Sequence, residues 1–466
     1  MYKYLLCWRY LRTRYIALAS VISVMLGVAT MIVVNSVMAG FSEKMRDRLH
    51  GVLADIVVES EYDMNGFYNS PEVMARVKAV TGDQVLAMAP AMETYGLMQF
   101  RYGGQKFTRQ VQVFGVRPEE RARTGDFAEY LVDEKSKRIK PSFEVPESLR
   151  LAASPAGQVI EGDPNSAINQ ALAAQAHEQV SDDGAIIGWA MGTVHRDGKD
   201  DFVLHRGDQI RLVYPKASQR PDPGADTFTV VGYFKSGMSE NDSTHIYVPL
   251  ERFQKVRLLV DESTGRGAVN QIQIKVKPGV DLDALKATIQ TALEELRPMY
   301  FKVSTWEQKQ GPLLSAVAVE QSILNMLLFF IIAVAGFGIL AIFSMIVVEK
   351  TRDIGVMKAL GASTSGVRGI FLGYGLLLGA VGSGVGMAGG LLFVHNINTI
   401  EKWLSNVTGR KVFDDSIYYF NEIPTLVEPW TVFWIVGGAL FIAAAASVWP
   451  AQRASKLHPV RALRFE

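Results

Sequence analysis

Apolar residues gather in four long runs, one near the start of the chain and three close together at its end. The first run extends from Tyr15 to Ser42. The others lie between Glu320 and Glu349, between Arg368 and Glu401, and between Glu428 and Arg453, and none contains Asp, Glu, Lys or Arg. About 20 apolar residues suffice to cross a bilayer as a helix. Between 42 and 320 every apolar stretch is short and interrupted by charge. The pattern predicts an α-helical membrane protein with four transmembrane helices in a one-plus-three arrangement and a large domain inserted between helices 1 and 2.

Basic residues beside the runs predict which ends face the cytoplasm. Residues 1–14 contain four basic residues and no acid, and basic residues also precede the third run and follow the fourth. An apolar run after a basic start could be a signal peptide, but this run is much longer than the usual 7–15 residues, so we expect a retained anchor. The expected order is a cytoplasmic N-terminus at 1–15, transmembrane helices at 16–42, 320–348, 369–395 and 429–450, an extracytoplasmic domain at 43–319, a cytoplasmic loop at 349–368, an extracytoplasmic loop at 396–428 and a cytoplasmic tail at 451–466.

The inserted domain has the sequence pattern of mixed α and β structure. Residues 96–116 predict a hairpin that turns at Gly103 and Gly104. Residues 282–296 have apolar positions at helical spacing. Further strands are predicted at 53–60, 209–214, 228–234, 245–249 and 271–276. The polar segment 117–183 is expected to form a subdomain or a flexible excursion, and no chemistry is assigned to it.

Composition and motifs argue against catalysis by this chain. The net charge of +1 gives no electrostatic case for nucleic acid. The single Cys7 allows no disulfide in the inserted domain. The sequence contains no phosphate-binding Gly-x-x-x-x-Gly-Lys-Ser/Thr loop, and its seven histidines show no metal-ligand spacing. We therefore expect no catalytic residue, no metal and no cofactor bound by this chain.

The cytoplasmic loop contains a short amphipathic segment. On a helix, Ile354, Met357 and Leu360 fall along one apolar stripe, and Gly361 is expected to end the helix. Amphipathicity alone allows two interpretations: a helix resting on lipid headgroups, or a coupling helix that docks into a cytoplasmic motor. The residues assigned to a coupling helix are Glu349, Lys350, Arg352, Asp353, Ile354, Gly355, Met357, Lys358, Leu360 and Gly361.

Two features inside the spans also allow two interpretations each. The third span has glycines at four-residue spacing, which permits close helix approach either within the subunit or at a dimer seam. Asn35 in the first span could line a cavity or hydrogen-bond a neighbouring helix. The glycines assigned to helix packing are Gly375, Gly379, Gly382, Gly386 and Gly390.

Several segments resemble ABC permeases of the MacB and FtsX superfamily. The loop from Glu349 to Ser363 is similar to the EKxRDIGxxKALGAS-type segment after the second span, and Pro450 to Arg464 is similar to the PAxRAxxxxPxxALR ending. Within the superfamily, Arg9–Arg12, Val33–Phe41 and Phe228–Met238 resemble segments of the lipoprotein-releasing LolC and LolE family. Asn35 and Ala39 depart from that family's pattern.

The resemblance implies a permease subunit of the inner membrane with a MacB-like periplasmic domain. It implies that a LolD-like cytoplasmic ATPase, which binds ATP and Mg, docks on the coupling helix and drives lipoprotein extraction by mechanotransmission. The implied partners also include a second permease copy or a paralogue, lipoprotein cargo, a LolA-like periplasmic carrier and the bilayer. Two alternatives stay open: a MacB-like efflux permease, and an FtsX-like signalling subunit that activates a cell-wall hydrolase.

Overall fold

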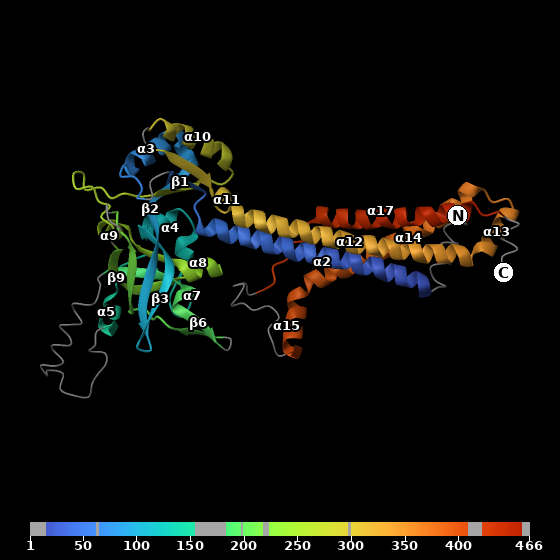
Figure 1. The fold of residues 1–466 in the computed structure, drawn as a ribbon, viewed down its shortest axis with the longest axis horizontal. Coiled ribbons are helices and arrows are strands. Elements are labelled where there is room, and N and C mark those ends of the chain that lie inside the picture. Colours follow the sequence, from blue (N-terminus) through green and yellow to red (C-terminus); the bar gives the residue numbers. More distant parts are fainter. Residues whose placement is uncertain are drawn as a thin grey trace. The chain divides into compact units, whose positions relative to one another are not determined.

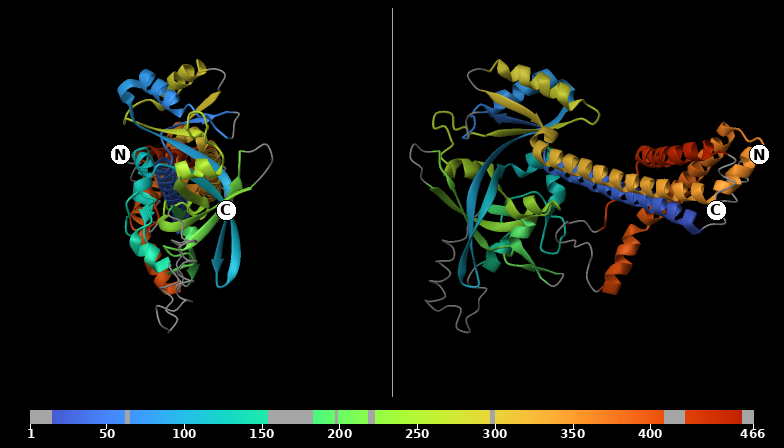
Figure 2. Two further views of the ribbon diagram at one scale, coloured as in Figure 1. Left: turned by 90° about the vertical axis from the view of Figure 1, so that its left-hand side faces the viewer. Right: turned by 45° about the vertical axis from the view of Figure 1, so that its right-hand side comes forward.

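The chain folds into two compact units, seen here in a computed structural model (Figures 1 and 2). The structure describes residues 15–61, 65–153, 183–196, 199–217, 223–296, 300–408 and 422–458. One unit contains the helices before residue 46 and after residue 312, and the other contains residues 46–312. The cytoplasmic N-terminus that the sequence predicts at 1–15 lies almost wholly outside the described residues.

The first unit is a helical bundle. In the described chain, four helices are long and apolar enough to cross a membrane: α2 (Tyr15–Val52), α12 (Gly311–Glu349), α14 (Thr364–His395) and α17 (Pro429–Ser455). They share one apolar core, to which Ile32, Phe343 and Leu378 contribute. The shorter helices α13 (Thr351–Ala359) and α15 (Ile397–Thr408) flank α14 in sequence. Both α2 and α12 are longer than the predicted spans; the 38 residues of α2 correspond to about 57 Å of helix.

The second unit is built on a sheet of ten strands among the described residues. The strand order is β12-β1-β11-β2-β3-β10-β5-β9-β4, and β8 pairs with both β2 and β9. Most of the sheet is antiparallel, with parallel pairs at β10–β3 and β5–β9. The strands are β1 (Ile56–Ser60), β2 (Val85–Tyr102), β3 (Gln105–Val116), β4 (Leu131–Val132), β5 (Gly184–Gly188), β8 (Gln209–Pro215), β9 (Pro223–Phe234), β10 (His245–Pro249), β11 (Gln271–Val276) and β12 (Phe301–Thr305).

Short elements complete this unit. Helices α3 (Ser70–Thr81) and α10 (Leu282–Glu294) lie side by side (Figure 1) and bury Val73, Val77, Leu285 and Ile289 in the main core. Strands β6 (Thr193–Arg196) and β7 (Lys199–Phe202) form a separate hairpin. The remaining elements are η1 (Gly82–Gln84), α4 (Pro118–Arg123), η2 (Asp126–Tyr130), α5 (Glu147–Ala153), α7 (Trp189–Gly192), α8 (Ser239–Thr244), α9 (Leu250–Val256) and α11 (Trp306–Lys309).

Most of the predicted strands and the predicted helix are confirmed. The β2–β3 hairpin turns at Gly103 and Gly104, whose φ angles are +57° and +81°. Glycine adopts these values without strain, which explains the pair of glycines at this turn. Elements β8, β9, β10, β11 and α10 lie where their patterns predict.

The first part of segment 117–183 is packed against the sheet. Phe127, Leu131, Phe143 and Val145 are buried in a second core cluster together with Tyr247. Of the two expectations for this segment, a flexible excursion is therefore wrong for residues 117–153. Its apolar residues occur singly or in runs of at most three among polar ones, so periodicity could not reveal them. Residues 154–182 lie outside the described part of the chain.

Candidate coupling site

Helix α13 ends in a glycine turn. The backbone N–H of Gly361 donates to the carbonyl of Lys358 (3.1 Å), and that of Ala362 donates to the carbonyl of Met357 (3.0 Å). Gly361 has a φ of +91°. This left-handed conformation closes helix ends of this kind and is adopted most easily by glycine. The predicted helix end at Gly361 is confirmed.

The apolar residues of α13 do not share one exposed stripe. Ile354 is fully buried in the core of the helical bundle, and Gly355 is buried as well. Met357 is half-buried against the same core. Val356 and Leu360 are 45% and 83% exposed. The exposed face of α13 therefore carries Val356 and Leu360, whereas the sequence pattern predicted Ile354 beside Leu360 on that face. Val356 and Leu360 are four residues apart, so the sequence also allows them to share one side of the helix. The predicted stripe, which includes Ile354 and Met357, is more apolar and hides this second possibility.

Lys358 contacts the end of α17. Its Nζ donates to the carbonyl oxygens of Ser455 (2.6 Å) and Leu457 (2.9 Å). A cation is favourable at a helix C-terminus, where the backbone carbonyls lack intrahelical partners. Lys358 thus connects α13 to α17 instead of facing outward.

The other charged residues of this segment lie at the surface. Lys350 Nζ is 2.7 Å from Asp353 Oδ2, a pair three residues apart. Glu349, Arg352 and Asp353 are exposed. Together with Val356 and Leu360 they form an exposed surface with acidic, basic and apolar parts, which we call the α13 surface.

The last turns of α2 belong to the sheet unit, where they are contacted by α4, η2 and the turn at Gly237. Arg121 is only 4% exposed, and its guanidinium donates to the carbonyl of Val52, the last residue of α2. Arg48 donates to the carbonyl of Gly237. A Cβ atom on Gly51 would collide with Tyr130 Oη, so a larger residue there would require the Tyr130 side chain to move. We call Arg121, Tyr130, Gly237 and their neighbour Asp242 the α2 socket. Sequence reasoning missed it because two of its members lie in the polar segment 117–183.

Asp242 fixes the turn that Arg48 contacts. Its carboxylate accepts hydrogen bonds from Ser236 N (2.8 Å), Ser236 Oγ (2.7 Å) and Gly237 N (3.1 Å). Burial raises the pKa of Asp242 to about 6, although these hydrogen bonds act in the opposite direction. Gly237 has a φ of +74°, and a Cβ atom there would lie 2.5 Å from Arg48 Nη1.

A second contact ties the end of α2 to the element before α12. His50 Nε2 is 2.5 Å from Asp55 Oδ1, and the His50 ring stacks on Trp306 with 4.9 Å between ring centroids. Trp306 begins α11, and its N–H donates to the Asp55 carbonyl (3.1 Å). The backbone N–H of Val276 donates to Asp55 Oδ2 (2.7 Å). The chain leaving α2 and the chain approaching α12 are thus joined through His50, Asp55 and Trp306.

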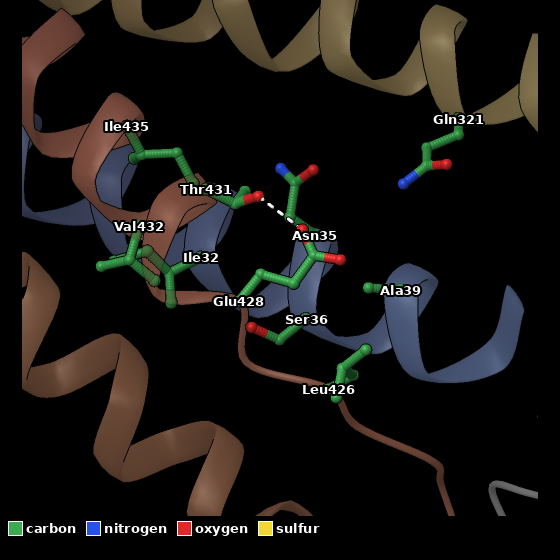
Figure 3. A pocket seen from close by; sticks show the side chains of 10 residues that line it. All are labelled: Ile32, Asn35, Ser36, Ala39, Gln321, Leu426, Glu428, Thr431, Val432 and Ile435. Carbon is green, nitrogen blue, oxygen red and sulfur yellow. Dashed lines mark hydrogen bonds between the residues drawn. The ribbon is translucent and has the colours of Figure 1, made fainter. Parts of the chain in front are cut away.

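The helical bundle contains a small pocket of about 20 Å³ between α2, α12 and the start of α17 (Figure 3). Asn35 and Ser36 line it from α2, Gln321 lines it from α12, and Thr431 Oγ1 donates to Glu428 Oε2 (2.8 Å). This volume holds about one water molecule. Asn35 Nδ2 donates to the Met31 carbonyl (3.0 Å), so this amide bonds within its own helix as well as lining the pocket.

The five spaced glycines of α14 contact other helices of the same chain. A Cβ atom on Gly375 or Gly379 would lie 2.5 or 2.6 Å from the side chains of Ser447 or Ala443 on α17. On Gly382, Gly386 and Gly390 it would lie 2.9, 2.6 and 3.2 Å from atoms of α2. These glycines allow α14 to approach both neighbours closely.

Comparisons with known proteins cover nearly the whole chain. Residues 17–292 match the MacB-like periplasmic core domain, and residues 325–459 match the FtsX-like permease C-terminal domain. The lipoprotein-releasing system transmembrane protein LolC of Xylella fastidiosa (strain 9a5c) is 25% identical over 98% of this chain and 97% of its own length. LolC of Neisseria meningitidis serogroup B is also 25% identical, over 98% of both chains.

Proposed function

Because the chain belongs to the ABC permease family that combines a MacB-like periplasmic domain with an FtsX-like permease domain, we propose that it extracts lipoproteins from the outer leaflet of the cytoplasmic membrane. The chain is a non-catalytic, multi-pass permease subunit of the inner membrane, and its family implies an ATPase partner that binds the nucleotide. The observation that supports lipoprotein extraction is the similarity to LolC over 98% of the chain.

In this proposal, a LolD-like ATPase binds the α13 surface on the cytoplasmic side. Val356 and Leu360 enter an apolar groove of the ATPase, and Glu349, Arg352 and Asp353 form polar contacts at its rim. The burial of Ile354 and the Lys358 contacts then pass the movement of α13 to α14 and α17. ATP and Mg bind to the ATPase and not to this chain.

The proposed work on the outer side is mechanical. A lipoprotein resists extraction because its acyl chains gain about 0.8 kcal/mol per buried methylene. Helix α2 continues without a break from the membrane segment to the α2 socket, so its movement reaches the periplasmic domain. That domain, together with a second copy or a paralogue, would close behind the cargo and pass it to a LolA-like carrier.

Mass spectrometry of what co-purifies with the tagged chain from its native membrane, in mild detergent without ATP, tests this function. We expect a P-loop ATPase together with acylated lipoproteins, and we expect ATP to release the lipoproteins. An ATPase with a cell-wall hydrolase and no lipoproteins would replace extraction by signalling. An ATPase with peptides or small hydrophobic compounds would replace it by efflux.

A variant pair tests the α13 surface in the same experiment. Val356→Asp combined with Leu360→Asp should abolish recovery of the ATPase, because a desolvated carboxylate in an apolar groove is strongly unfavourable. Val80→Asp is the matched control, since Val80 is 38% exposed on α3 of the other unit. Full ATPase recovery with the double variant would refute docking at this surface.

A further inference from the structure

A groove lies between the cytoplasmic ends of α14 and α17. Its volume is about 550 Å³, and its lining includes Thr364, Ser365, Arg368, Gln452 and Lys456. The periplasmic domain joins α2 to α12, so the start of α14 and the end of α17 both lie on the cytoplasmic side. The lining contains two cations from different helices and no acidic residue.

Neither cation forms an ion pair with another residue that the structure describes. Among the residues that the structure describes, neither Arg368 nor Lys456 lies within salt-bridge distance of a carboxylate, and both are exposed. The nearby Arg453 is different, because its guanidinium lies 5.6 Å from the centre of the Trp449 ring and does not line the groove. Two unpaired cations on the walls of one groove are suited to an anion such as a phosphate group.

The position of the cations along the helices places them at headgroup depth. Arg368 is the last charged residue before the charge-free run of α14, and Lys456 follows the charge-free run of α17 by a few residues. Gly369 and Leu372 also line the groove, and both follow Arg368 in the sequence, within the charge-free run of α14. Gly369 has no heavy atom within 4 Å of its Cβ position, so the groove stays open at this level. The lining is therefore cationic at one end and apolar at the other.

We propose that this groove binds an anionic phospholipid of the inner leaflet. Its phosphate would lie between Arg368 and Lys456, with Ser365 and Gln452 as further hydrogen-bond donors, and its chains would follow Gly369 and Leu372 into the bilayer. Basic pockets between transmembrane helices on the cytoplasmic side are suited to such headgroups. An acidic residue of the ATPase would match the cations equally well, but it would not account for the apolar end. The site does not depend on the cargo.

Native mass spectrometry of the purified full-length chain tests the proposal, with phosphatidylglycerol and phosphatidylcholine as probes. We expect phosphatidylglycerol to bind at least about tenfold more tightly than phosphatidylcholine. Arg368→Gln combined with Lys456→Gln should remove this preference, and Gly369→Leu should weaken binding by filling the groove without changing its charge. Arg453→Gln removes one charge from the same helix end and should bind normally.

Three results would overturn the proposal. Equal phosphatidylglycerol binding by the wild type and the double variant would place the lipid elsewhere. Displacement of the lipid by an excess of inorganic phosphate would indicate a site for a free anion. Loss of ATPase co-purification by the double variant, with lipid binding intact, would assign the groove to the ATPase.

Discussion

The contact between α14 and α2 makes a sharp prediction about Gly386. A Cβ atom at this position would lie 2.6 Å from the carbonyl oxygen of Met25, whereas ordinary contacts begin at 3.4 Å. The backbone of α2 cannot rotate away as a side chain could. The two helices would have to separate by about 0.8 Å, and overpacking of this kind costs about 1–3 kcal/mol.

Gly389→Ala provides the matched control for Gly386→Ala. Gly389 lies three residues further along α14 and is exposed, with no heavy atom within 4 Å of its Cβ position. Both substitutions give the same gain in helix propensity, so their difference isolates the contact with α2. We expect Gly386→Ala to melt roughly 2–10 °C below Gly389→Ala, measured by size-exclusion chromatography after heating in detergent. Equal melting temperatures would refute the close approach of these helices.

Three further predictions concern the ends of the helices. Gly237→Ala should destabilise the protein more than Gly279→Ala does, because both glycines have positive φ but only a Cβ atom at Gly237 would clash with Arg48. Equal decreases in melting temperature would contradict the contact between Gly237 and Arg48. Burial raises the pKa of Asp242 to about 6, so its carboxyl group binds a proton more tightly in the folded protein than in the unfolded chain. The stability of the wild type relative to Asp242→Asn should rise by about 2 kcal/mol as the pH falls from 7 to 4, and a constant difference in melting temperature would contradict this. Lys358→Met should cost about 1–2 kcal/mol of stability by removing both contacts to the end of α17, whereas the exposed Arg352→Met should cost little.

The sequence predicts the spans and most strands well because those signals are local. A charge-free apolar run of 20 or more residues fits few structures other than a transmembrane helix. A pair of glycines between two alternating runs fits few other than a hairpin turn. The residues at which α2 and α12 begin and end are not determined by local sequence signals. Gly51 and Val52 are helical, beyond the apolar run, because the α2 socket encloses them, and the residues of the socket come from segments far away in sequence.

The α13 segment shows a second limit of sequence reasoning. An amphipathic helix has one apolar face in the sequence, but this helix contacts the bundle on one side and exposes apolar residues on the other. Ile354, the most buried of the predicted stripe, faces the bundle, and Leu360 faces outward. Only the positions of α14 and α17 decide between these faces. Periodicity identifies the helix and cannot identify the partner of each side.

Within the proposed mechanism, these contacts define where a push on the α13 surface would go. Ile354 and Lys358 connect α13 to the bundle. The glycines of α14 approach the backbone of α2 and the short side chains of Ser447 and Ala443 on α17, which leaves few flexible side chains between these helices. Close-packed interfaces transmit displacement because they compress little. At the outer end, Arg48 and Arg121 bind backbone carbonyls instead of flexible side chains. Within the bundle, a displacement of α13 would therefore pass to α14 and α17 through the buried Ile354 and the Lys358 contacts.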